Sequence, residues 1–169
     1  MDWLQIVLRV VHIAAGIFWV GAATFLLVFV EPTMHALGPQ GGPFMRHMTA
    51  VRKMPTVIAV SAVLTIVAGI WLYWRDTGGF EPDVIATGPG IGFGVGGLAA
   101  ILAFVLGLTL VRPRVERMGA LAGAMASGSP SPEQAQEMAA LQRKLRSISV
   151  FNQVLLVIAV IAMATARYL

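Results

Sequence analysis

The chain of 169 residues is 57% apolar and only 12% charged, which excludes an ordinary water-soluble domain, because such domains average about 25% charged residues. It contains no cysteine, which excludes disulfides, thiolate metal sites, iron–sulfur clusters and covalently attached c-type haem. Its net charge of +4 does not indicate a nucleic-acid partner, since the basic residues gather in two segments between apolar stretches, as they do in membrane proteins.

Four long apolar stretches define the expected architecture. A helix needs about 20 apolar residues to cross the roughly 30 Å hydrocarbon core of a lipid bilayer, and each stretch supplies that length. The first stretch opens with Asp2 instead of a basic segment and is too long for a secretory signal, so we interpret it as a membrane helix. We predict an all-α fold, a polytopic membrane four-helix bundle forming one domain over residues 1–169. The helices are expected over about residues 3–30, 55–75, 91–111 and 133–167, the last beginning as a cytoplasmic extension.

His12 lies inside the first apolar stretch, one helical turn after Arg9 and one turn before Gly16. A titratable side chain at membrane depth is costly to insert, so it indicates a functional site, here a metal ligand or redox group. The alternative is a neutral histidine that donates to a backbone carbonyl of a neighbouring helix. Counting the helical rise places His12 about 12 Å below the outer end of its helix. The segments at the same depth are residues 65–69, 94–98 and 160–163.

The first helix is expected to end at Glu31, because the residue before a proline is disfavoured in the α conformation. The loop that follows contains histidines and methionines, whose imidazole and thioether groups suit Cu(I). Copper binding is therefore an alternative function, although methionine is also a common packing residue and Arg46 would repel a cation. These groups lie about 30 Å or more from His12 along the bundle and are too distant to share one metal ion with it. The candidate copper ligands are His35, Met45, His47 and Met48.

The third apolar stretch begins with a run of glycines from Gly88 to Gly97. A glycine inside a helix costs up to about 1 kcal/mol relative to alanine, so this segment must allow something to approach closely. One interpretation is helix–helix contact, since Gly92 and Gly96 form a small-xxx-small pattern. The other is a flat recess for a planar cofactor beside His12. The two interpretations are compatible if they concern different faces of the helix.

The loop charges indicate the orientation in the membrane. Cytoplasmic loops carry an excess of lysine and arginine, and here the first and third loops hold most of them, whereas the second loop is mixed. We therefore expect loops one and three in the cytoplasm and both termini outside. In the third loop, the linker of residues 127–133 leads to Ser131, which is expected to cap a helix starting at Pro132. The basic residues of the two loops are Arg46, Arg52, Lys53, Arg112, Arg114, Arg117, Arg143, Lys144 and Arg146.

The segment from Val11 to Gly21, with His12 and Trp19, resembles the opening helix of two bacterial membrane families. One is the copper resistance protein D family with its four-helix relatives, and the other is the haem-associated membrane protoporphyrinogen IX oxidase family. The resemblance implies a bacterial inner-membrane protein in which His12 is tied to haem b. The oxidase family also needs a lysine at the start of the third membrane helix. This chain has glycines there, from Gly90 to Gly97, so it departs from the oxidase family at a residue needed for porphyrinogen oxidation, whereas haem binding and an oxidase-like activity stay open.

These observations lead to one favoured functional prediction. The protein is expected to bind haem b in the outer half of the bundle for electron transfer or porphyrin redox chemistry, with a redox partner in the membrane or periplasm. The alternatives are copper handling and a structural subunit without a cofactor. The iron is expected to be six-coordinate through a second ligand, five-coordinate, or shared across a homodimer. The expected site comprises His12 as axial ligand, Arg9 as propionate partner, Gly16 and Trp19 as walls, Gly92, Gly96 and Gly97 as the close-approach surface, and Met163 as the second axial ligand.

Overall fold

The computed structural model describes residues 2–128 and 131–169, and every element in these two ranges is helical. Residues 129 and 130 of the predicted linker lie outside the described part of the chain. The elements are α1 (Trp3–Phe25), η1 (Leu26–Val30), α2 (Glu31–Leu37), η2 (Gly38–Gly41), α3 (Gly42–Arg46), η3 (His47–Val51), α4 (Met54–Asp76), α5 (Pro82–Ile85), α6 (Gly88–Leu106), η4 (Gly107–Val111), α7 (Arg112–Ser127), α8 (Pro132–Thr165) and η5 (Ala166–Tyr168).

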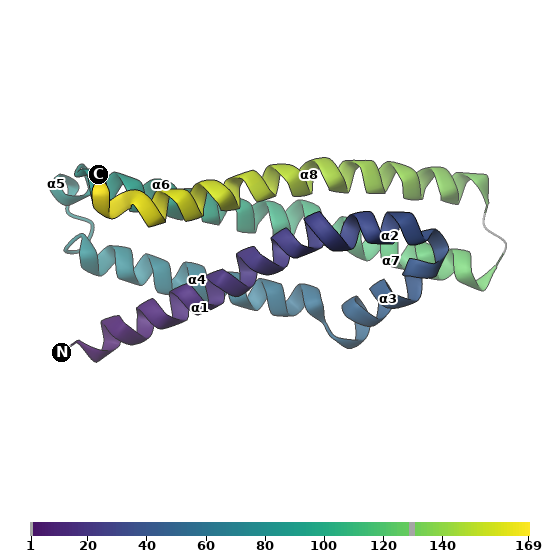
Figure 1. Ribbon diagram of the computed structural model, residues 1–169, viewed down its shortest axis with the longest axis horizontal. Helices are drawn as coiled ribbons and strands as arrows, with labels where there is room; N and C mark the ends of the chain where they lie inside the picture. Colours follow the sequence, from purple (N-terminus) through teal and green to yellow (C-terminus); the bar gives the residue numbers. More distant parts are fainter. Residues whose placement is uncertain (1, 129–130) are drawn as a thin grey trace.

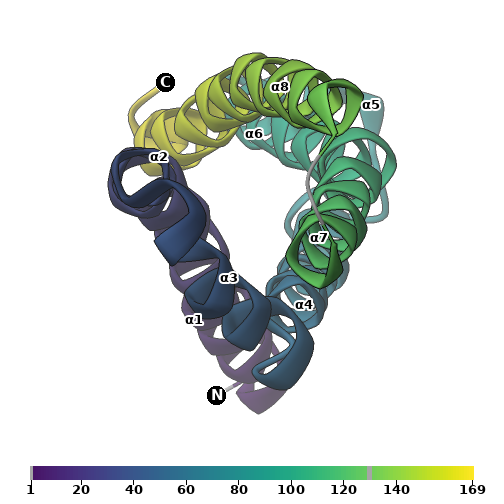
Figure 2. The ribbon, with the colours of Figure 1, turned by 90° about the vertical axis from the view of Figure 1, so that its right-hand side faces the viewer.

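The helices form an elongated bundle with both termini at one end (Figure 1). Helix α1 packs mainly on α4, and α6 packs mainly on α8. Contacts between α4 and α6 join the two pairs, whereas α1 touches α8 only lightly. Figure 2, seen from the end opposite the termini, shows the helices arranged in a ring. By length and composition, four helices of the described chain are able to cross a membrane, as predicted.

Helix one does not end at Glu31, as the sequence suggested, but continues through Pro32 to Leu37. The reason is the π-helical turn η1 directly before the proline, in which the Glu31 N–H bonds to the Leu26 carbonyl five residues back. A proline inside a regular α-helix clashes with the carbonyl four residues earlier, and the wider π turn relieves that clash. The same device, η4, precedes Pro113 and lets the third span continue from α6 into α7.

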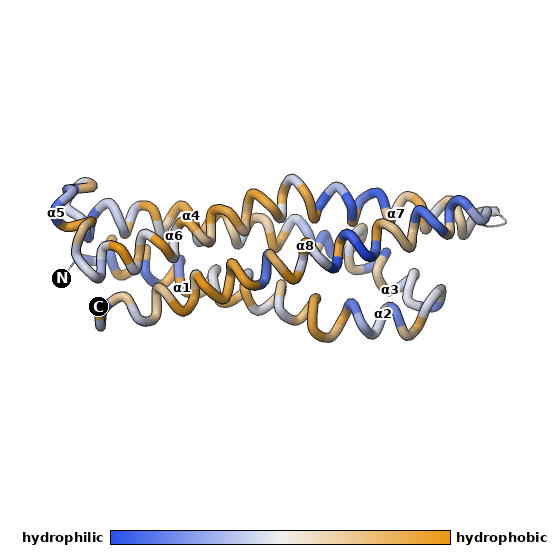
Figure 3. The backbone as a smooth tube through the Cα atoms, turned by 90° about the horizontal axis from the view of Figure 1, so that it is seen from above, coloured by the Kyte–Doolittle hydropathy of each residue, from blue (hydrophilic) through white to orange (hydrophobic). Residues whose placement is uncertain are grey.

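The fourth helix is one continuous element that begins outside the apolar region. Ser131 caps it as predicted, with its hydroxyl accepting from the Gln134 N–H, while the Gln134 side chain accepts from the Ser131 N–H. Pro132 occupies the first turn, where its missing N–H has no helical partner to lose. Figure 3 shows the colour changing from hydrophilic to hydrophobic along α8. The polar extension and the membrane span are therefore a single rod.

The core consists mostly of small side chains, which allow the helices to approach closely. Trp19 is its one large aromatic member and is only 5% exposed. Most large apolar side chains instead lie on the outside of the bundle. An apolar exterior of this extent is unfavourable in water and suits a lipid bilayer, so the structure is that of a multi-pass membrane protein. The buried core residues are Trp19, Ala62, Ala99, Ala100, Ala103, Leu156 and Ala159.

Candidate functional site

The His12 side chain reaches from α1 to the backbone of α4. Its Nδ1 atom lies 2.7 Å from the carbonyl oxygen of Thr65. Because a carbonyl oxygen only accepts hydrogen bonds, Nδ1 carries the proton and donates, and Nε2 retains a free lone pair. Among the described residues, no hydrogen-bond partner of Nε2 is found. The histidine is therefore held as one tautomer, with one nitrogen still able to bind a metal ion.

Two glycines make this contact possible. A β-carbon at Gly69 would lie only 2.8 Å from His12 Cε1 and 2.9 Å from Nδ1, so the imidazole ring occupies the space that a side chain would take. On the facing helix, a β-carbon at Gly16 would lie 3.4 Å from Thr65 Cγ2. Both glycines lie one turn from the polar residue of their own helix. The pair His12 and Gly16 thus interlocks with the pair Thr65 and Gly69.

Thr65 itself is only 7% exposed, and its hydroxyl donates to the Ser61 carbonyl within α4. The Thr65 carbonyl can accept both the N–H of its own helix and the N–H of His12, because a carbonyl oxygen has two lone pairs. The depth count placed residues 65–69 level with His12, and the structure confirms that this segment is the one His12 contacts. The contact matches the carbonyl-donating alternative of the sequence analysis, and it is equally compatible with a ligand role for Nε2.

Arg9 lies on the same helix, one turn nearer the terminal end. Its Nη2 atom is 3.8 Å from Asp76 Oδ2, with both side chains nearly half exposed, at 45% and 42%. Gln5 donates to the other oxygen of the same carboxylate at 2.9 Å, and Arg75 pairs with Asp2 beside them. An exposed ion pair at this distance contributes little to stability. Arg9 is therefore free to turn toward another anion.

Trp19 lies two turns deeper than His12 and packs edge-on against Phe104, with ring centroids 6.4 Å apart. The predicted wall residue is thus a member of the helical core, where α1 meets α6.

Two glycines of the α6 run, Gly92 and Gly96, pack against η5 and α8. A β-carbon at Gly96 would meet Met163 Cγ at 2.8 Å and the Ala159 carbonyl oxygen at 3.2 Å, and one at Gly92 would meet Ala166 at 2.9 Å. These two glycines therefore serve helix–helix contact, which is one of the two interpretations made from the sequence. Gly97 has no atom within 4 Å of its β position, and Met163 packs on Gly96. His12 instead contacts Thr65 and Gly69 of α4.

The candidate copper ligands are dispersed over three elements of the first loop. His35 belongs to α2, Met45 to α3, and His47 and Met48 to η3. Met48 lines an apolar groove with Phe18 and Phe25 instead of facing a histidine. Within residues 2–128 and 131–169, no group of three or more His, Cys, Asp or Glu side chains is placed to hold a metal ion.

Comparison with protein-family models, with curated proteins and with solved structures found no match to this chain. The resemblance of the His12 helix to two bacterial membrane families therefore stays a prediction. The functional assignment rests on the geometry around His12.

Proposed function

We propose that the protein binds haem b at membrane depth through Nε2 of His12 and serves electron transfer or porphyrin redox chemistry. The hydrogen bond from His12 Nδ1 to the Thr65 carbonyl carries the proposal. Histidines that bind metals almost always donate their second ring N–H to a carbonyl or carboxylate, which fixes the tautomer and the ring orientation. His12 has this arrangement, and the Gly69 slot adds a steric restraint on the ring.

The surrounding residues fit a haem in part. Arg9 lies one turn from His12 toward the end of the bundle, its ion pair with Asp76 is 3.8 Å long, and it would be the cation that pairs with the haem propionates. Gly92 and Gly96 would not contact the planar group, because η5 and α8 already cover these two glycines. When bound, haem supplies one-electron chemistry at its iron, and this chain supplies the ligand, its orientation and an apolar surrounding.

The proposed orientation in the membrane rests on the charges of the loops. Loops one and three are placed in the cytoplasm, both termini in the periplasm, and the bundle in a bacterial inner membrane. Electrons pass to or from a redox partner in the membrane or periplasm. Any further ligand to the group would come from a second copy of the chain in a homodimer.

The absorption spectrum of the purified protein tests this proposal. After expression with ample haem and purification in mild detergent, the wild-type protein should show a Soret band. His12→Ala should remove that band, because the axial nitrogen is lost. The variant should still insert and fold, since the four apolar spans supply the insertion energy. Arg9→Ala should weaken haem retention without abolishing the band, because a propionate contact is peripheral to the iron bond.

His35→Ala and His47→Ala are the matched controls, since each removes one imidazole from the other end of the bundle. Both should leave the Soret band unchanged. A colourless wild-type protein, or a band that survives His12→Ala and disappears with His47→Ala, would overturn the assignment. Metal analysis of a colourless sample would then distinguish copper in the first loop from a subunit without a cofactor.

A further inference from the structure

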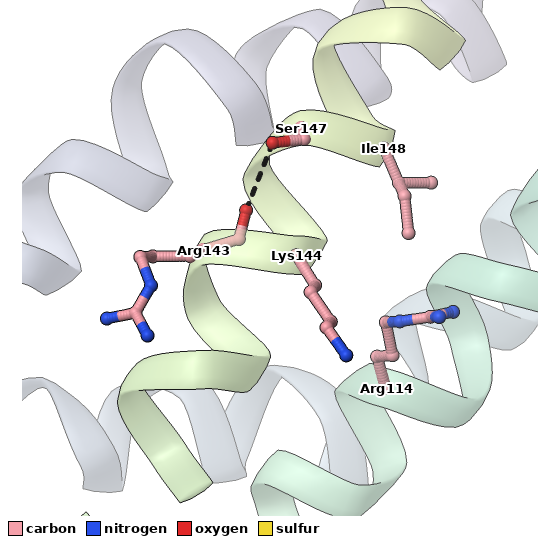
Figure 4. A pocket seen from close by; sticks show the side chains of 5 residues that line it. All are labelled: Arg114, Arg143, Lys144, Ser147 and Ile148. Atoms are coloured by element: carbon pink, nitrogen blue, oxygen red, sulfur yellow. Dashed lines mark hydrogen bonds between the residues drawn. The ribbon is translucent and has the colours of Figure 1, made fainter. Parts of the chain in front are cut away.

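A basic pocket of about 400 Å³ lies between the start of α7 and the middle of α8. Figure 4 shows the Lys144 side chain of α8 extending toward α7, while the Arg114 side chain rises from α7 and turns along its own helix. Arg143 extends to the other side of α8, away from these two cations. The pocket is lined by Arg114, Arg143, Lys144, Ser147 and Ile148.

Arg114 and Lys144 have no carboxylate partner among the described residues, whereas three other arginines of α7 and α8 do. Arg112 pairs with Glu116, Arg117 with Glu137, and Arg146 lies 4.0 Å from Glu31. Arg114 donates one hydrogen bond to the Leu110 carbonyl of its own helix at 2.7 Å and keeps its remaining N–H groups available. No acidic side chain lines the pocket, so the positive charge of its lining is available to an external anion.

The position of the pocket selects the class of anion. Ile148 lines the pocket at the residue where the apolar span of α8 begins, and the polar extension of α8 supplies Lys144 one turn earlier. Arg114 follows directly after the apolar segment that ends with Val111. Cations at the boundary between an apolar span and a polar helix lie at the level of lipid headgroups. Arginine binds phosphate oxygens with a planar set of donors, and lysine adds a compact point charge.

We propose that this pocket binds the phosphodiester headgroup of an anionic phospholipid, with Arg114 and Lys144 on the phosphate and Ile148 against the start of an acyl chain. Basic pockets between membrane helices are known to take anionic headgroups. The site is separate from His12, which lies in the half of the bundle near the termini, so it stands whether or not the protein binds haem.

Native mass spectrometry of the detergent-purified protein tests the site directly. The wild-type protein should retain phosphatidylglycerol in preference to phosphatidylcholine, which carries the same phosphodiester but no net charge. Arg114→Gln/Lys144→Gln should lower the apparent affinity for phosphatidylglycerol at least about tenfold. The charge-conserving variant Arg114→Lys/Lys144→Arg should retain most of that affinity, which separates a lost site from a misfolded protein.

The matched control is Arg46→Gln/Arg52→Gln, which removes two exposed cations from the basic first loop and leaves the pocket intact. This variant should change the phosphatidylglycerol affinity less than about twofold. The two arginines are outside the pocket, and salt screens the attraction between exposed charges and a distant headgroup. If both double variants lost the same phosphatidylglycerol affinity, the lipid would be held by the overall positive charge of the protein, and the proposed site would be overturned. Equal binding of the two lipids, or complete displacement of phosphatidylglycerol by inorganic phosphate, would overturn the lipid assignment.

Discussion

The imidazole ring of His12 lies over Gly69, with Cε1 only 2.8 Å from the point that a β-carbon of Gly69 would occupy. This close approach joins α1 to α4 and aligns Nδ1 with the Thr65 carbonyl. Any side chain at position 69 would displace the ring or separate the two helices. The glycine is therefore part of the histidine site.

Gly69→Ala should lower the free energy of unfolding by about 1–3 kcal/mol, the usual cost of overpacking a closely packed contact. The measurement is thermal unfolding of the purified protein in mild detergent. Gly21→Ala is the control, because an added β-carbon there meets no atom within 4 Å. Equal stability of the two variants would contradict the close contact between the ring and α4.

A double-mutant cycle assigns this effect to the histidine ring. On a His12→Ala background the ring is absent, so Gly69→Ala should cost much less than it does in the wild-type protein. Residues in direct contact show coupling energies of about 0.5–3 kcal/mol in such cycles. The same thermal unfolding measurement on the four proteins gives the coupling, and a value near zero would place the effect of Gly69→Ala elsewhere.

The glycine run of α6 allows a second matched test. Gly96→Leu should separate α6 from α8, because Met163 and the backbone of Ala159 leave no space for a side chain. Gly97→Leu adds the same side chain one residue later, where no atom lies within 4 Å. We expect Gly96→Leu to cost about 1–3 kcal/mol or more in thermal unfolding and Gly97→Leu to cost little. The reverse order would mean that the run faces another partner.

The spans were predictable from the sequence because long apolar stretches in lipid must satisfy their own backbone hydrogen bonds, and a helix does so. The depth of His12 relative to residues 65–69 also followed from helical rise alone. The specific partner did not, since the Thr65 acceptor is a backbone carbonyl that every residue type carries. Gly69 fell within the segment expected at that depth, but its contact with the ring, 57 positions earlier in the chain, could not be read from the sequence.

Two further features required the structure. The continuation of helix one past Pro32 depends on the π turn η1, and nothing in the residues Leu26–Val30 distinguishes them from ordinary α-helix formers. The glycine run allowed two interpretations, because a pattern of small residues shows that something comes close without showing what it is. The position of Met163 over Gly96 shows that α8 occupies that face.

The capping box of α8 should govern the order of its polar extension. Ser131→Ala removes the acceptor of the Gln134 N–H and should cost about 1 kcal/mol at that helix end. The first turn should then fray, and the amide protons of Gln134 and Ala135 should exchange faster with solvent deuterium. Ser147→Ala is the control, since its hydroxyl bonds only to the Arg143 carbonyl within the helix. Unchanged exchange at residues 134 and 135 would show that the cap does not hold the extension.

The orientation of the bundle can be tested with single cysteines, because the chain has none of its own. Gln40 lies in the basic first loop and Ala86 in the mixed second loop, and both side chains are exposed. The excess of lysine and arginine in loops one and three predicts that Gln40→Cys is shielded from membrane-impermeant thiol reagents in intact cells, whereas Ala86→Cys is labelled. Lysed cells should label both variants, which controls for local accessibility. Labelling of Gln40→Cys alone in intact cells would invert the bundle, and His12 would then lie near the cytoplasmic face, where its redox partner would have to be sought.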